Sequence, residues 1–193
     1  KTTKAFALLF TAGLVLAGCG QKQDSTATTQ AQAKAETTTA APTTATPTTA
    51  TPTTVAQAKT EMPAGAQKTV FEASAKGGTE TMTVYYKDDV LLKQETVEVY
   101  TLSQLEVENA LEKLQNNTAR TKETLKDFIG KGFEYNTEHK GDIFTITYSF
   151  DYTKIDLDKL KEKIPGLNLR DDKTLSYSAY KEGLLKGGYK EKQ

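Results

Sequence analysis

The stretch FTITYSF, residues 144–150, alternates strictly between large apolar or aromatic side chains and small hydroxyl side chains. Successive side chains of a β-strand point to opposite faces of its sheet. The four even-numbered residues therefore share one face, and Thr145, Thr147 and Ser149 share the other. Antiparallel sheets commonly pack one face on a core and leave the other polar. The stretch thus predicts a strand in a sheet with one apolar face and one polar face.

The alternation continues on both sides of this stretch. Segments 133–139 and 143–152 predict a hairpin about the turn Lys140-Gly141-Asp142, because Gly and Asp favour turns. Three further antiparallel strands are expected upstream, separated by turns at 76–78 and 88–89. They span residues 70–75, 79–87 and 90–101.

The third of these upstream strands changes phase along its length. Val90 and Leu92 have one parity, whereas Val97 and Val99 have the other. A β-bulge adds one residue to a strand and would bring both apolar pairs onto the core face. We therefore expect a bulge near residues 94–95.

A long amphipathic helix is predicted after the third strand. Ser103 and Glu106 have the spacing of a capping box, and apolar residues then recur at steps of three and four. This pattern predicts a helix over 104–129. Asn116-Asn117 is the point at which it could break in two.

Two shorter helices complete the expected fold. Asp156 can cap a short helix that Pro165-Gly166 ends, and a last helix is expected from near Ser176 to Gly187-Gly188. The predicted class is α+β. We expect an antiparallel sheet of about five strands, with the long helix and the C-terminal helix packed on one face.

The beginning of the sequence predicts export and lipid attachment. Two lysines precede an apolar run at residues 5–16, which is too short to span a bilayer and has the proportions of a signal peptide. Ala17 and Gly18 then lead to Cys19, a pattern that resembles the bacterial lipobox. We expect cleavage between Gly18 and Cys19 and lipidation of Cys19. The alternative is a buried N-terminal helix in which the cysteine is a small hydrophobe.

Three regions follow from this assignment: a lipoprotein signal peptide at 1–18, a spacer at 19–67 that begins with the lipidated cysteine, and a folded domain at 68–193. The spacer is rich in Thr, Ala, Gln and Pro, with the near-repeats APTT, ATPTT and ATPTT at 41–54. Such a composition predicts disorder, because too little apolar surface is available for a core. A low-complexity insertion without selected length is the alternative, and O-glycans on its threonines stay an open question.

Charge and cysteine content narrow the functional classes. The 25 basic and 25 acidic residues give a formal net charge of zero, so the basic surface expected of a nucleic-acid-binding protein is missing. Cys19 is the single cysteine. With its sulfur lipidated, the folded domain would depend on its core without a disulfide.

Several segments of the sequence resemble the YehR-like family of small bacterial lipoproteins. They are TVYYKDDVLLKQE (83–95), TITYSFDYTKIDLDKLK (145–161), IPG (164–166) and GGYKE (187–191). The resemblance covers about residues 70–192 and the lipobox, and implies a compact extracytoplasmic α+β domain of uncharacterised role. No functional residues are established for this family, so the resemblance assigns none in this sequence. The long Thr/Pro spacer departs from the family pattern and suggests a thicker envelope, as at a Gram-positive cell surface.

Sites for nucleophiles or metals are weakly supported. The one histidine, His139, lies at a predicted strand end, and no Gly-x-Ser-x-Gly elbow offers it a serine. Zinc needs several His or Cys ligands at short spacing, and this sequence has one residue of each type. Asp151, Asp156 and Asp158 lack the spacing of a calcium loop and are better explained as a strand end and a helix cap. We therefore expect no metal and no other cofactor.

Carboxylate pairs are the remaining candidates for catalysis, since glycoside hydrolysis uses two acids across a cleft. Glu134 and Glu138 share a strand face, and Asp88-Asp89 and Asp171-Asp172 fall in turns. Each pair has a simpler role as a solvated face, a cap or a turn. The sequence therefore favours a protein that is not an enzyme.

Binding is the better supported class of function. Tyrosines can stack on sugars or anchor a protein partner, and Tyr85 with Thr145, Thr147 and Ser149 would form a polar docking face. The leading hypothesis is a membrane-tethered, non-enzymatic accessory or binding domain with an envelope protein or glycan as partner. The alternatives are a ligand-capturing lipoprotein for a transporter and a small envelope hydrolase.

The anchor assignment predicts the effect of Cys19→Ser. A serine hydroxyl is a far poorer nucleophile than a thiolate, so this variant should not be lipidated, and its precursor should stay uncleaved or be released aberrantly. Metabolic labelling with a palmitate analogue measures this. Label in the serine variant equal to that in the parent chain would contradict the assignment.

Overall fold

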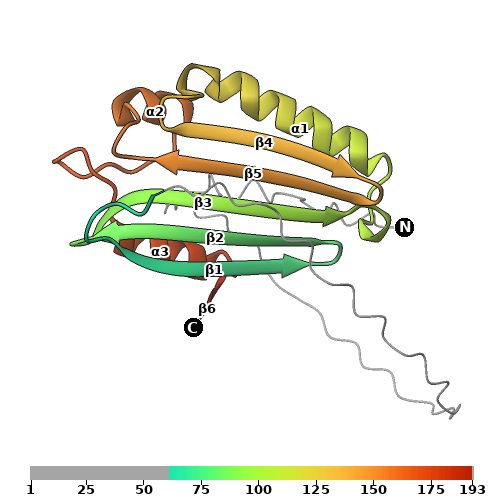
Figure 1. The fold of residues 1–193 in the computed structure, drawn as a ribbon, viewed down its shortest axis with the longest axis horizontal. Coiled ribbons are helices and arrows are strands. Elements are labelled where there is room, and N and C mark those ends of the chain that lie inside the picture. Colours follow the sequence, from blue (N-terminus) through green and yellow to red (C-terminus); the bar gives the residue numbers. More distant parts are fainter. Residues whose placement is uncertain (1–60, 193) are drawn as a thin grey trace, which may run out of the picture. The chain divides into compact units, whose positions relative to one another are not determined.

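The computed structural model describes residues 61–192 (Figure 1). The predicted signal peptide, the predicted cleavage position after Gly18, the predicted lipidation site Cys19 and the expected spacer up to residue 60 lie outside the described residues. The elements, in chain order, are β1 Gln67–Ala75, β2 Gly78–Lys87, β3 Val90–Thr101, η2 Leu102–Gln104, α1 Ala110–Leu125, η3 Lys126–Phe128, β4 Phe133–Lys140, β5 Ile143–Asp151, α2 Leu157–Lys163, α3 Tyr177–Lys186 and β6 Lys190–Lys192.

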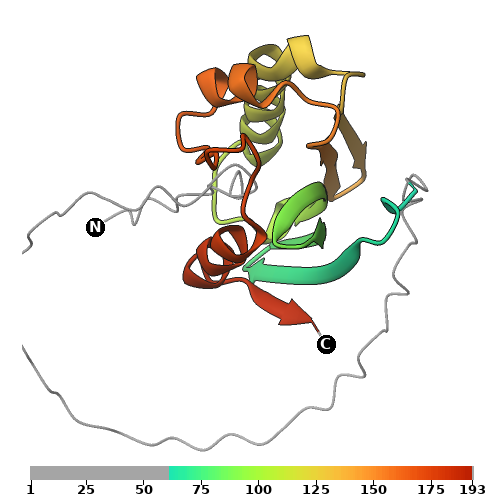
Figure 2. The same ribbon diagram turned by 90° about the vertical axis from the view of Figure 1, so that its left-hand side faces the viewer.

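The strands form one antiparallel sheet in the order β4-β5-β3-β2-β1-β6. The three α-helices lie on the same side of this sheet (Figure 2). The α+β class is therefore confirmed. The strand count differs slightly from the expected five, because residues 190–192 pair with residues 70–72 of β1 and add the short edge strand β6.

The stretch at 144–150 lies in β5 and has the predicted two faces. Phe144, Ile146, Tyr148 and Phe150 are between 1% and 7% exposed and belong to the hydrophobic core. On the opposite face, the side chains at 147 and 149 are half-buried. Residue 145 is only 6% exposed, so that end of the polar face is less open than expected.

The expected position of the bulge and the expected core face of β3 are both wrong. Tyr85 pairs with Lys93 and Tyr86 with Leu91, so Leu92 is the extra residue, ahead of the predicted position. Beyond it the side chains on the core face are Gln94, Thr96, Glu98 and Tyr100, while Val97 and Val99 face the other way. The cause is the pairing of β3 with β5, which places residue 96 opposite 148 and residue 98 opposite 146.

The predicted start of the long helix is also wrong. The Ser103 backbone N–H donates to Asp142 Oδ1 over 2.8 Å, and its hydroxyl donates to Asp142 Oδ2, so this serine fastens η2 to the β4–β5 turn. Helix α1 begins instead after Asn109, which has the left-handed φ of 55°. It continues without a break through Asn116-Asn117 and buries Leu114, Thr118 and Leu125.

The two C-terminal helices begin as predicted. The Asp156 carboxylate accepts from the Lys159 N–H over 3.2 Å, and the Ser176 hydroxyl accepts from the Ala179 N–H over 3.2 Å. Such side-chain bonds satisfy backbone donors that have no partner within the helix. Within residues 61–192, no helix combines the length and hydropathy needed to cross a membrane.

The two faces of β5 should respond differently to mutation. Phe144→Ala removes most of a side chain that is 3% exposed and should cost ~3–5 kcal/mol of stability. Thr147→Ala, on the half-buried opposite face, should stay within ~0.5 kcal/mol. Denaturant unfolding of both variants and the parent chain measures the difference. Equal losses would contradict the assignment of the core to one face.

Candidate functional site

The predicted docking residues lie on the face of the sheet that carries none of the described helices (Figure 2), which we call the helix-free face. Thr145, Thr147 and Ser149 come from β5, and Tyr85 comes from β2. Strand β3 runs between β2 and β5, so Tyr85 lies about 10 Å from β5, or two strand spacings. The structure brings these residues onto one face but not into one cluster.

A lysine and a glutamate of β3 fill the space between them. Lys93 Nζ lies 2.6 Å from Glu95 Oε1 and 5.5 Å from the centre of the Tyr85 ring. The Tyr85 hydroxyl donates to Glu95 Oε2 over 3.1 Å. Burial, followed by the Glu95 charge, raises the pKa of Tyr85 to about 12, so the phenol stays a neutral donor. The sequence analysis missed this cluster because Lys93 is 2% exposed, an unusual burial for a lysine.

Two of the predicted carboxylate pairs have structural roles. Glu134 and Glu138 are exposed on β4, and Glu138 forms an ion pair with Lys140 over 2.6 Å. Asp172 accepts from the Thr174 N–H over 3.0 Å and shapes its own turn. The single histidine, His139, is exposed near the end of β4, with its Nε2 2.8 Å from the carbonyl oxygen of residue 141.

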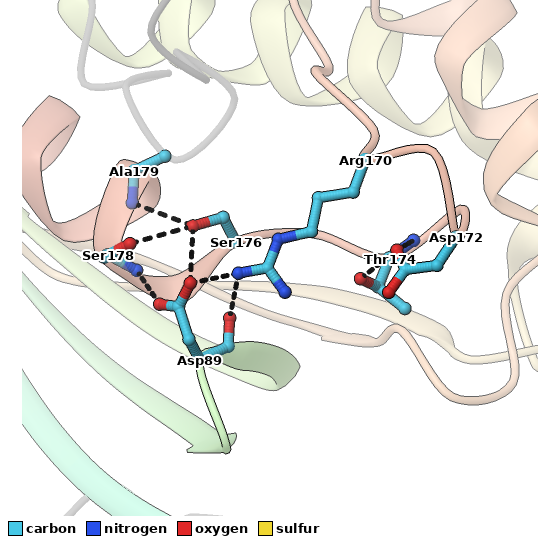
Figure 3. A network of polar contacts seen from close by, with 7 residues as sticks. All are labelled: Asp89, Arg170, Asp172, Thr174, Ser176, Ser178 and Ala179. Atoms are coloured by element: carbon cyan, nitrogen blue, oxygen red, sulfur yellow. Dashed lines mark hydrogen bonds and ion pairs between the residues drawn. The ribbon is translucent and has the colours of Figure 1, made fainter.

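Asp89, from the third pair, fastens the β2–β3 turn to α3 (Figure 3). Its Oδ1 accepts from the Ser178 N–H over 2.7 Å, and its Oδ2 accepts from the Ser176 hydroxyl over 3.1 Å and from Arg170 Nη2. Burial alone would raise the pKa of Asp89, but these hydrogen bonds and the Arg170 charge hold it below the usual value. The Asp89 carboxylate therefore has a structural role.

The unexpected chemical feature is a pair of buried glutamates on the helix-covered face. Glu80 of β2 and Glu98 of β3 are directly opposite each other, and they are 0% and 3% exposed. Opposite residues of antiparallel strands have Cβ atoms about 4.5–5.5 Å apart. Glu80 has the same parity as the apolar residues Met82 and Val84, and this pattern could have placed it on the core face. The wrong phase assigned to β3 concealed Glu98.

Phenol groups solvate these two carboxyls. The Tyr189 hydroxyl donates to Glu80 Oε2 and the Tyr100 hydroxyl to Glu98 Oε2, each over 2.7 Å. Glu80 Oε1 is buried and has no hydrogen-bond partner within the described part of the chain. In the same region no ion pair joins either glutamate to Lys, Arg or His. Two such charges about 5 Å apart would repel by ~3 kcal/mol at an effective dielectric constant near 20.

The two carboxyls consequently hold protons more tightly than ordinary glutamates. Burial raises the pKa of Glu80 to about 7, against the lowering effect of the Tyr189 hydrogen bond. Burial, followed by the Glu80 charge, raises the pKa of Glu98 to about 8, although hydrogen bonds from Tyr100 and Tyr148 oppose the rise. Near neutral pH the pair therefore carries at least one proton.

A second polar cluster continues along the same face. Gln94 Oε1 accepts from the Tyr180 hydroxyl over 2.5 Å and from the Tyr152 hydroxyl over 3.1 Å. Its amide nitrogen donates to the Thr96 hydroxyl over 3.0 Å. These bonds explain how a polar strand can occupy the centre of the core, since buried polar groups cost little when they are paired.

The chemistry available to this site is limited by access. Two carboxyls of unequal pKa resemble an acid and base set, yet catalysis requires that a substrate reach both groups. Residues 61–192 contain no group of three or more His, Cys, Asp or Glu residues that could hold a metal ion. Because Glu80 and Glu98 are buried, they are better placed to hold a proton than to act on a substrate.

Residues 67–190 match the family model described as "Protein of unknown function (DUF1307)". The NMR structure of the E. coli YehR protein is 21% identical, with a TM-score of 0.48 over 65% of this chain and 90% of that one. An NMR structure from Streptococcus pneumoniae TIGR4 is 18% identical, with a TM-score of 0.43 over 79% and 100%. The search of curated proteins gave no match.

The buried pair predicts a stability that falls as pH rises. The folded-state pKa values of Glu80 and Glu98 exceed the ordinary value of 4.5, so the folded chain binds more protons than the unfolded one between about pH 4.5 and 8. The stabilisation is complete below about pH 4.5 and is lost through pH 7–8. Because each pKa unit corresponds to about 1.4 kcal/mol, the loss from the two glutamates together should be on the order of 6 kcal/mol between about pH 5 and 8.5.

Denaturant unfolding at several pH values measures this slope. The double variant Glu80→Gln with Glu98→Gln should flatten it, whereas Glu112→Gln on the exposed side of α1 should leave it unchanged. A parent chain equally stable at about pH 5 and 8.5 would show that the pair titrates normally.

Proposed function

The chain belongs to the DUF1307 family of proteins of unknown function, the YehR-like family that its sequence resembles, and from this premise we propose that it is a membrane-anchored, non-enzymatic binding module. The segment Leu16-Ala17-Gly18-Cys19 supports an acyl anchor on Cys19. The Thr/Pro-rich spacer supports a domain held away from the membrane on the extracytoplasmic side. With two or three acyl chains, attachment would be effectively permanent.

The helix-free face is the observation that carries the binding role. Threonine, serine and valine side chains cover three neighbouring strands, and these short side chains give a flat surface that offers hydroxyl groups and apolar contacts. The half-buried members are Thr81, Glu95, Val97, Val99, Thr147 and Ser149. Protein interfaces combine apolar area with satisfied hydrogen bonds in this manner.

The state of Tyr85 favours a protein over a glycan as the partner. Stacking on a sugar needs an accessible aromatic ring, but Tyr85 is 8% exposed and Lys93 lies over its ring. Lys93 and Glu95 also neutralise each other, so this pair adds no net charge to the face. We therefore propose an envelope protein as the occupant.

The positions of the acidic side chains support a non-enzymatic role. The carboxyls with raised pKa values, Glu80 and Glu98, lie on the helix-covered face and are almost fully buried. The exposed acids on β4 have an ion-pair partner or a solvated position. This distribution supports binding rather than hydrolysis.

In-cell photocrosslinking tests the proposal. A photoreactive residue at Thr147 of the full-length chain should capture a defined protein, because that side chain lies on the helix-free face. Adding Thr81→Arg should abolish capture, since residue 81 shares that face and a long charged side chain would obstruct docking. Adding Gln115→Arg, on the exposed side of α1, should leave capture unchanged.

Three outcomes would contradict the proposal. Capture that survives Thr81→Arg, or that Gln115→Arg abolishes equally, would show that the helix-free face is not the docking surface. Crosslinks to glycan alone would replace the protein partner with a carbohydrate. Thermal unfolding of each variant serves as the control for folding.

A further inference from the structure

The buried pair lacks the positive charge that two carboxylates would require. Glu80 and Glu98 face each other from neighbouring strands, and Glu80 Oε1 has no donor within residues 61–192. A buried acceptor without a donor is costly. A single proton held between the two carboxyls supplies the missing donor and removes one of the two charges.

The titratable groups that act on the pair from the surrounding elements are phenols. They are Tyr100 on β3, Tyr135 on β4, Tyr148 on β5, Tyr180 on α3 and Tyr189 after α3. Burial raises the pKa of each of these phenols. They therefore stay neutral over the range in which the carboxyls titrate, and they provide hydrogen bonds without providing positive charge.

Two lysines on the neighbouring helices interact with other groups. Lys122 of α1 lies 5.7 Å from the centre of the Tyr135 ring, and Lys181 of α3 forms an ion pair with Glu191 over 2.6 Å. On β1, the residue opposite Glu80 is Ala73. Loss of the shared proton would thus leave two negative charges in the core that no ion pair within residues 61–192 neutralises.

The C-terminal segment that contacts the pair lies at one edge of the sheet. Gly187 to Lys192, which we call the C-terminal clasp, contains Tyr189 and the three-residue strand β6. Strand β6 pairs with β1 alone, at the edge of the sheet, whereas β2 and β3 each have a neighbour on both sides. Gly188 has a φ of 93°, and this position can serve as the hinge.

We propose that the proton shared by Glu80 and Glu98 keeps the C-terminal clasp closed, and that release of this proton to solvent opens it. In the closed state the Tyr189 hydroxyl bonds to Glu80 in a dry, singly charged site. In the open state Tyr189 and β6 leave the sheet, so that water reaches both carboxylates. The clasp is a pH-sensitive element whose equilibrium changes about tenfold per pH unit above the pKa of the pair.

Backbone amide exchange on the full-length chain tests whether the C-terminal clasp opens as pH rises. The exchange rates are corrected for their intrinsic dependence on pH. Protection of the amides of residues 189–192 should fall at least ~tenfold between about pH 6 and 8.5, while that of β5 amides changes far less. In Glu80→Gln, with one ionisable group removed, the clasp amides should stay protected over the whole range. The matched control Glu112→Gln should behave like the parent chain.

Other results would overturn the proposal. These are clasp protection that is independent of pH in the parent chain, or an equal fall in Glu80→Gln. If that variant does not fold, Glu98→Gln and the carboxyl ¹³C shifts of the parent chain replace it. Both shifts titrating below about pH 5 would exclude a shared proton. Protection restored at about pH 8.5 by calcium or magnesium chloride, but not by sodium chloride of equal ionic strength, would identify a metal site instead.

Discussion

The pairing of β3 with β5 is the constraint on which the rest of this structure depends. It places Thr96 opposite Tyr148 and Glu98 opposite Ile146, and so determines which side chains of β3 enter the core. A slip of one residue would exchange the two faces of a strand. Val97 and Val99 would then be buried, and the two glutamates would no longer share a face. The extra residue Leu92 absorbs the change of phase and keeps Leu91 in the core.

The sequence predicted the structure correctly where the residues followed a single pattern. It failed where two patterns of residues indicated different faces or different partners. Strict alternation predicted both faces of β5, and the caps at Asp156 and Ser176 predicted two helix starts. In β3 the valines have high β-propensity, but a strand residue can satisfy that preference on either face. The correct face was set by tyrosines of β5 and α3, distant in sequence, that hydrogen-bond the polar side chains. Ser103 was likewise predicted to cap a helix, but it hydrogen-bonds to Asp142, 39 residues away.

The two proposals draw on alternate residues of a single strand. Glu95 and Val97 face the proposed protein partner, whereas Thr96 and Glu98 face the polar core. Strand β3 has neighbours on both sides, which restricts its movement and keeps the two functions on separate surfaces. The carboxyl pair can respond to pH through the clasp at the edge of the sheet while the docking face keeps its shape.

The position of Tyr189 also has a kinetic consequence. Its hydroxyl meets Glu80 across 109 residues of chain, and β6 joins β1 over a similar separation. Under the proposed export, the N-terminal part of the chain crosses the membrane first, so strands β1 to β5 can pair before Tyr189 has crossed. During that interval Glu80 lies at the surface of an unfinished sheet as an ordinary hydrated carboxylate. Contacts between distant residues form slowly, and the uptake of a proton by the glutamate pair should therefore mark the final step of folding.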